Sequence, residues 1–311
     1  MIQIFRKPDY EFIGRRRWAY TVSVVFLAIG LISLAVRGLH YDIDFTGGTL
    51  VQVRFEQAPD VGRIRAALGT AGMNDSIIQE FGDRQEYIVR LPLASGAASE
   101  ETGAKVRTAL SGDPTLGKVD IRRVEFVGPQ VGRELQLQAI YAVLVGLAGI
   151  LIYVAVRFDL KGSVAAIAAV FHDVIICLGA MSLTGREFSL PVLAALLTII
   201  GYSVNDTIVA YDRLRENRGR GQRGKSFAEQ MNNAVNETLS RTVLTALTTF
   251  FSTIVLLVLG GKVLEDFAFV LVIGVITGTY STIYVAGALV VDWTYYVEGR
   301  GRKGKKAVAK A

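Results

Sequence analysis

The chain has 311 residues, of which 51% are hydrophobic and 20% charged, and its mean hydropathy is +0.39. A composition this apolar lies outside the range of ordinary soluble proteins and indicates several membrane spans. The single cysteine excludes an internal disulfide framework and a thiolate metal cluster. The Lys and Arg residues behind the net charge of +6 gather beside apolar runs, which argues against nucleic-acid binding.

The first predicted element is a membrane span over residues 18–36, since about 20 apolar residues in a helix cross the roughly 30 Å core of a bilayer. It is not expected to be a cleaved signal peptide, because no small-residue cleavage site follows it.

The segment 37–133 that follows predicts a separate soluble domain. LVQVRFE alternates like a strand, and SIIQEFG, EYIVRLP and KVDIRRVEFVG are also predicted to be strands. APDVGRIRAALGTAG is predicted to be a helix that ends at Gly72, and SEETGAKVRTALSG a helix with Ser99 as its N-cap. The order βαββαβ matches the ferredoxin-like split unit. Gly47 and Gly48 at its start are expected to form a turn with positive φ. We interpret the segment as a binding or gating module.

Five further spans are predicted in a membrane bundle over residues 137–291. They are residues 137–156, 164–183, 190–210, 242–259 and 267–291. The predicted fold class is therefore a polytopic α-helical membrane protein of six spans with an inserted α+β, ferredoxin-like domain.

Basic residues mark one side of this arrangement. They gather in the N-terminal segment 1–17, between the fourth and fifth spans, and in the tail 292–311. Because short loops rich in Lys and Arg stay in the cytoplasm, we expect both termini to be cytoplasmic and the segment 37–133 to lie across the membrane.

Three stretches carry a resemblance to a known family. YDIDFTGGTLVQVRF, after the first span, resembles the Phe-Thr-Gly-Gly motif of SecF. IGYSVNDTIVAYDRLREN resembles the signature of the fourth span of SecF, and LSRTVLTALTTF resembles the start of its fifth span. With the similar six-span layout, the resemblance to the SecD/SecF protein-export family, part of the RND superfamily, covers about residues 10–295.

This resemblance implies a role, a location and partners. A SecF-like subunit of the bacterial inner membrane works with SecD beside the SecYEG translocon, and uses the proton motive force to promote export of unfolded preproteins. It has no cofactor besides the proton gradient, and its large domain is periplasmic. No second six-span half is present here, so SecD is expected to be a separate chain.

Two other functions remain open on the residues: a proton-coupled half-transporter for a small or lipidic solute, and a purely structural partner of SecD. The sequence contains no P-loop, nucleophile elbow or paired catalytic carboxylates, so it predicts no enzyme.

Asp206 lies inside the fourth predicted span, where an ionised group costs several kcal/mol. On a helix, Thr198, Tyr202 and Asp206 share one face, and Gly201 and Asn205 adjoin it. We interpret Thr198, Tyr202 and Asn205 as supporting polar groups.

The fifth predicted span carries a matching polar stripe that begins with Arg241 and Thr245. Asp206 and Arg241 are expected at similar depth, because the two spans are antiparallel neighbours. A carboxylate opposite an Arg keeps its charge, and burial favours the protonated form when the Arg moves away. This is the chemistry of a proton carrier, and the resemblance also ties Asp206 and Arg241 to proton transport. The alternatives are that Asp206 only hydrogen-bonds a broken helix and that Arg241 is a flanking charge.

His172 and Asp173 lie near the middle of the third predicted span and should face the bundle interior. They either support the proton site or make a structural hydrogen bond to a neighbouring helix or to SecD. No zinc site is expected, because the chain has only two histidines and no HEXXH pattern. Gly274 and Gly278 form a GxxxG in the sixth span, which predicts close helix packing.

Overall fold

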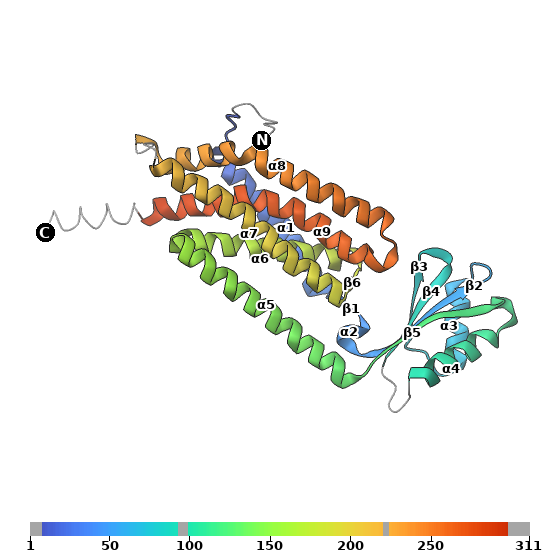
Figure 1. Ribbon diagram of the computed structural model, residues 1–311. Coiled ribbons are helices and arrows are strands. Elements are labelled where there is room, and N and C mark those ends of the chain that lie inside the picture. Colours follow the sequence, from blue (N-terminus) through green and yellow to red (C-terminus); the bar gives the residue numbers. More distant parts are fainter. Residues whose placement is uncertain (1–7, 93–98, 220–223, 298–311) are drawn as a thin grey trace.

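The computed structural model describes residues 8–92, 99–219 and 224–297. It has two parts, a bundle of long helices and a smaller α+β domain at one end of the bundle (Figure 1). The first long helix begins, and the last one ends, at the end of the bundle away from this domain. Residues 1–7 and 298–311, which hold parts of the predicted basic segments 1–17 and 292–311, lie outside the described ranges.

Within the described ranges, six helices are long and apolar enough to cross a membrane, which confirms the predicted six-span fold class. The 3₁₀ turn Ile13–Arg15 leads into the first of them, and a π-helical turn, Thr282–Gly287, continues the last. The six are α1 (Arg16–Arg37), α5 (Pro129–Arg157), α6 (Leu160–Thr184), α7 (Leu190–Gly219), α8 (Phe227–Leu259) and α9 (Lys262–Ser281).

Helices α7 and α8 extend well beyond the predicted spans 190–210 and 242–259. Helix α7 continues to Gly219, and α8 already begins at Phe227. A hydropathy pattern misses these extensions because most of their residues are polar, and each extension buries only a few apolar side chains. The buried apolar residues in the extension of α8 are Met231, Ala234, Val235 and Leu239.

Local side-chain chemistry sets the ends of these helices. Ser226 and Glu229 form a capping box at the start of α8, in which each side chain accepts from the other residue's backbone N–H. Asp159 caps α6 by accepting from the N–H of Gly162 at 2.9 Å. Gly185 ends α6 in the left-handed conformation, with φ +66°.

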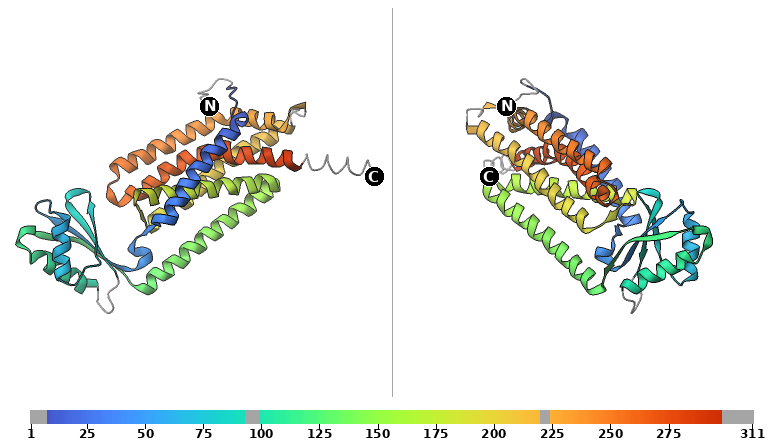
Figure 2. Two further views of the ribbon diagram at one scale, coloured as in Figure 1. Left: turned by 180° about the vertical axis from the view of Figure 1, so that it is seen from behind. Right: turned by 45° about the vertical axis from the view of Figure 1, so that its right-hand side comes forward.

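Helices α7 and α1 cross opposite faces of the bundle, as the front view of Figure 1 and the rear view of Figure 2 show. Helix α9 packs against α6, α7 and α8. In the last span, Lys262–Val297, 61% of the most apolar stretch is buried, compared with 6% in α5 and 11% in α8. Helices α5 and α8 therefore leave most of their surface uncovered by the described parts of the chain.

The α+β domain is a four-stranded antiparallel sheet, ordered β3-β4-β2-β5, with two helices packed on one face. The strands are β2 (Gly48–Phe55), β3 (Ile77–Phe81), β4 (Asp83–Leu91) and β5 (Val119–Val127). The helices are α3 (Val61–Thr70) and α4 (Ser99–Ser111), and the 3₁₀ turn Pro114–Leu116 follows α4. The order βαββαβ is the one predicted for this segment.

The sheet has two different faces, because side chains alternate along a strand. Val51, Val53 and Phe55 of β2 are buried against α3 and α4 in the domain core. Leu50 and Gln52, which alternate with them, belong to the opposite face. That face looks toward the helical bundle (Figure 1).

The domain joins the bundle at a turn formed by Gly47 and Gly48. Short strands β1 (His40–Tyr41) and β6 (Glu187–Phe188) pair in parallel, and α2 (Ile43–Thr46) leads into this turn. The φ angles of +69° at Gly47 and +137° at Gly48 confirm the expected positive φ. A Cβ at Gly132 on α5 would lie 3.2 Å from the amide nitrogen of Gly47, so α5 starts against the turn.

Candidate functional site

Asp206 on α7 is 3% exposed, and its Oδ2 has no hydrogen-bond partner in the described part of the chain. A buried carboxylate oxygen without a donor is costly, because the desolvation of the charged form is not offset. Such a carboxylate is free to change its protonation state without breaking a network of hydrogen bonds.

Arg241 on α8 is exposed, and the structure shows no ion pair between it and Asp206 within 4 Å among the described residues. Arg241 is nevertheless close enough for its charge to act on the Asp206 carboxylate. The two groups that the sequence predicts as a pair are therefore electrostatic neighbours that do not touch.

The polar face predicted on the fourth span is divided in the structure. Thr198 and Asn205 are exposed, Tyr202 is half-buried, and Asp206 points inward. The physical reason is the pitch of the helix: eight residues turn it by roughly 80° beyond two full turns, whereas seven leave a residue roughly 20° from its starting direction. Asn205 therefore shares a face with Thr198, and Asp206 does not.

The two predicted threonines, Thr198 and Thr245, are satisfied by their own helices. Thr198 donates to the carbonyl of Ala194 at 2.8 Å, and Thr245 donates to that of Arg241 at 2.9 Å. Such bonds one turn back let a threonine face an apolar environment without another partner. Among the predicted site residues, which all lie in the described part of the chain, the exposed side chains that still call for a polar neighbour are those of Asn205 and Arg241.

Asp173 on α6 lies in a hydrogen-bonded cluster that joins three helices. Its Oδ2 accepts from the hydroxyls of Ser203 on α7 and Ser281 on α9, both at 2.7 Å. Its Oδ1 lies 3.0 Å from Nδ1 of His172. The His172 ring is stacked on Tyr280. The hydrogen-bond partners of Asp173 thus lie on helices of this same chain.

Sequence reasoning missed Ser203 and Thr207, although both lie in the motif around Asp206. They are spaced by four residues on α7, which places them on one helix face, and both are buried. That spacing was the available signal. The π-helical turn after Ser281 has no comparable signal; such turns are frequent at functional sites.

Gly274 and Gly278 lie against α7 of the same chain. A Cβ at Gly274 would collide with the side chain of Ile199, and a Cβ at Gly278 would lie 3.2 Å from the Cβ of Ser203. The two glycines therefore let α9 approach α7 next to the Asp173 cluster.

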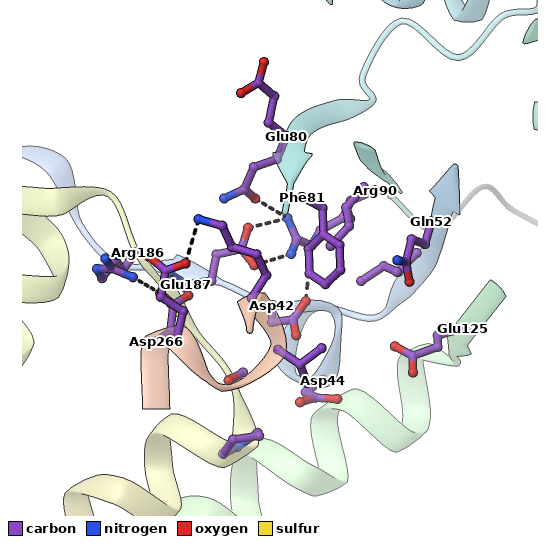
Figure 3. Close-up of a pocket in the computed structure, with 18 of the residues that line it drawn as sticks. Asp42, Asp44, Gln52, Glu80, Phe81, Arg90, Glu125, Arg186, Glu187 and Asp266 are labelled. Atoms are coloured by element: carbon purple, nitrogen blue, oxygen red, sulfur yellow. Dashed lines mark hydrogen bonds and ion pairs between the residues drawn. The ribbon is translucent and has the colours of Figure 1, made fainter. Parts of the chain in front are cut away.

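A second group of charged residues surrounds a cavity of about 470 Å³ between the sheet and the end of the bundle, here called the junction pocket (Figure 3). Arg90 on β4 forms a two-pronged ion pair with Glu187 on β6. The same guanidinium donates to Asp42 at 3.2 Å and to Gln79 at 3.0 Å. Sequence reasoning did not single out any of these residues.

Further contacts of the junction pocket reach the first turns of α7 and α9. Arg186 pairs with Asp266 at 2.5 Å and with Glu265 at 2.9 Å. The backbone N–H of Leu190, the first residue of α7, donates to Asp44 at 3.2 Å. The connection that leads into the domain is therefore bonded directly to the start of the helix that carries Asp206.

Burial raises the pKa of Glu187 to about 7. The nearby positive charge of Arg90 opposes this shift, whereas Asp42 and Asp266 add to it. Burial also raises the pKa of Asp44, although its hydrogen bond from Leu190 works in the other direction. The junction pocket therefore contains a carboxyl group that titrates near neutral pH.

Six apolar helices, an α+β domain inserted after the first, and buried acidic groups in the bundle define a polytopic membrane protein. Residues 109–295 match the family model of the C-terminal region of the protein export membrane proteins SecD and SecF. Residues 32–59 match the family model of the SecD/SecF GG motif. The chain therefore belongs to the SecD/SecF family of protein export membrane proteins, which confirms the resemblance seen in the sequence.

Relatives that match nearly the whole chain are named protein translocase subunit SecF. The one from Desulfurispirillum indicum is 47% identical over 300 residues, which cover 94% of each chain. The one from Pseudomonas aeruginosa is 41% identical over 281 residues, which cover 90% of each chain. The chain is thus a relative of SecF translocase subunits along its length.

The solved structures that match are of SecDF. One, described as a translocon-associated membrane protein from Thermus thermophilus, is 42% identical with a TM-score of 0.83, and the match covers 92% of this chain and 39% of that one. Another, in a super-membrane-facing form, is 40% identical with a TM-score of 0.70, and the match covers 100% of this chain and 41% of that one. The chain thus spans about two fifths of the SecDF chains.

Proposed function

We propose that the protein is a SecF-like subunit that works with SecD in the bacterial inner membrane and uses the proton motive force to promote preprotein export. In this proposal both termini are cytoplasmic and the α+β domain is periplasmic. The names of the relatives support a role in transport rather than catalysis. The association of the matching SecDF with a translocon supports a place beside SecYEG.

The observation that carries the proposal is the buried Asp206 carboxylate, with Arg241 nearby but not in contact. A proton crossing the membrane releases about 2.3 kcal/mol per 100 mV. This energy can drive a conformational change only if a titratable group couples to it. A carboxylate that meets Arg241 in one arrangement and loses it in another takes up and releases a proton as the helices move.

A partner is supported by what α7 and α8 leave uncovered. Arg241 and Asn205 are exposed on membrane-spanning helices, and polar groups in a membrane are expected to face protein or water rather than lipid. The SecDF chain is more than twice as long as this one, so we expect a SecD chain with its own bundle to cover these exposed polar groups.

The test uses Asp206→Asn in the complex with SecD. The Asn side chain keeps the size and hydrogen-bonding capacity of Asp but does not titrate. We expect normal assembly and loss of the gradient-dependent part of export, whereas Asp206→Glu, which still titrates, keeps part of it. Arg241→Met is also expected to impair coupling. Export by the complex is measured in vesicles with and without a proton gradient.

Full gradient-dependent export by the Asn variant, at normal protein levels, would show that the chain is a structural partner of SecD. Gradient-driven movement of a small solute with no effect on export would instead favour the half-transporter.

A further inference from the structure

The junction pocket lies between the α+β domain and the end of the bundle where α7 and α9 begin. The domain itself is not part of the bundle. The domain is linked to the bundle by two chain connections, from α1 through β1 and α2, and from β5 into α5. Beyond these connections, side chains hold the sheet against the connection between α6 and α7 (Figure 3).

Arg90 makes the central contact. It stands on the sheet face that looks away from the domain core, and its side chain is only 10% exposed. Its planar guanidinium meets acceptors from three separate segments: Gln79 of β3, Asp42 before α2, and Glu187 of β6. A buried two-pronged arginine–carboxylate pair is among the strongest and most directional contacts that side chains form.

Glu187 transmits this contact to α7. It lies three residues before Leu190, where α7 begins. The backbone N–H of Asp42 donates to the carbonyl of Phe188, and the Asp44 carboxylate accepts from the N–H of Leu190, so both hold this short connection in place. Helix α7 is a single α-helix of 30 residues, so Asp206 lies roughly 24 Å along a continuous rod. A shift of its first turn is therefore carried to the level of Asp206.

We propose that Arg90 is a positioning residue: with Glu187 it forms a clasp that joins the position of the α+β domain to that of α7, and thereby to the membrane site at Asp206. The proposal rests on the proposed function, because it names the path by which that site acts on the domain. The clasp is the two-state element: it is either closed, with the guanidinium on Glu187, or open, with the domain held only by its chain connections.

The surroundings of Glu187 make the clasp sensitive to the pH on the domain side. The charged or titratable groups around it are Arg90 on β4, Asp42 before α2, His40 on β1, Asp266 on α9 and Arg186 on its own connection. Since the pKa of Glu187 is about 7, its ionised form pairs with Arg90 above this pH, and protonation below it weakens the pair.

The experiment reverses the charges in the full complex with SecD. Arg90→Glu and Glu187→Arg are each expected to lower gradient-dependent export about tenfold, because each leaves a buried charge without its partner. The double variant restores an opposite-charge pair and is expected to recover at least half of the lost activity. Export without a gradient is expected to stay unchanged.

A matched control exists in the same sheet. Arg54 on β2 and Glu86 on β4 form an ion pair at 3.8 Å, and the Arg54 side chain is 41% exposed. Reversal of this pair should leave export unchanged, since an exposed pair contributes little. Protein level and co-purification with SecD, measured for every variant, separate loss of coupling from loss of folding.

Full gradient-dependent export by Arg90→Glu, or a double variant as inactive as the single ones at normal protein levels, would overturn the clasp. Failure of the clasp and failure of the proposed function are distinguishable. If Arg90→Glu is active while Asp206→Asn is not, only the clasp is wrong. If Asp206→Asn is also fully active, the proposed proton coupling is wrong.

Discussion

Two buried aspartates in the bundle differ in what surrounds them. Asp173 accepts hydrogen bonds from two serines and adjoins His172, so its carboxylate is satisfied on both oxygens. Asp206 is as buried, yet its Oδ2 has no partner in the described part of the chain. A fully bonded carboxylate fixes structure, whereas an unbonded one is available to bind a proton. We therefore assign Asp173 to the packing of three helices and Asp206 to the proposed chemistry.

Glu187 gives a prediction about pH. In the unfolded chain its carboxyl group titrates near 4.5, and in the folded protein near 7. Between these values the unfolded state loses its proton before the folded state does, so this residue's contribution to stability falls as the pH rises. The full loss is on the order of 3 kcal/mol above pH 7. We expect Glu187→Gln to remove this part of the slope when unfolding of the purified complex is followed from pH 4.5 to 8.

Glu101→Gln is the control for this measurement. Glu101 is exposed and pairs with Lys105 on α4, so its replacement should leave the slope as in the parent protein. An unchanged slope in Glu187→Gln would mean that Glu187 does not titrate near neutral pH.

At the scale of helices, the contact between α9 and α7 depends on the absence of a side chain at Gly274. A Cβ there would collide with Ile199, so Gly274→Ala is expected to cost about 1–3 kcal/mol of stability through overpacking. Ile199→Ala, combined with it, makes room for the new methyl group and should recover part of the loss. Thermal unfolding of the purified complex measures both.

Gly149 on α5 is the control position, because a Cβ there meets nothing within 4 Å in this chain. Gly149→Ala should leave the unfolding temperature unchanged or raise it slightly, since Ala favours a helix over Gly. If Gly274→Ala were equally harmless, the close contact between α9 and α7 would be wrong.

The elements that the sequence predicts well are those defined by local patterns. Long apolar runs predict the six spans, and alternation predicts the strands of the domain, because both depend on neighbours within a few residues. The polar ends of α7 and α8 carry no such pattern; their helical form depends on Met231 and other residues buried against distant segments.

The residues of the candidate site also fall into those that a local pattern predicts and those that depend on distant contacts. Asp206 is predictable because a charge inside an apolar run is unusual in itself. Arg90 and Glu187 are not, because each resembles an ordinary surface residue and 97 positions separate them. Ser203 and Ser281 join Asp173 for a similar reason: only the packing of three helices brings them together.

For the whole molecule, the two faces of the bundle differ in the groups that they expose. Helix α1 crosses one face, and its exposed side chains include Trp18, Val25 and Phe26, which suit lipid (Figure 2). Helix α7 crosses the opposite face, where Asn205 is exposed, and Arg241 is exposed on the adjacent α8. A lipid environment satisfies the first face and not the second.

This asymmetry predicts which face SecD covers. A photo-crosslinking amino acid at position 205 should capture SecD in the membrane, because the exposed amide of Asn205 needs a protein neighbour. The same amino acid at position 25, on α1, should capture lipid or nothing, since Val25 is 50% exposed on an apolar face. Because both variants keep Asp206 and Arg241, each is expected to support export, and export by each variant is measured as a control. Capture of SecD from position 25 and not from position 205 would place the partner on the α1 face, and would remove the argument that SecD shields the membrane site.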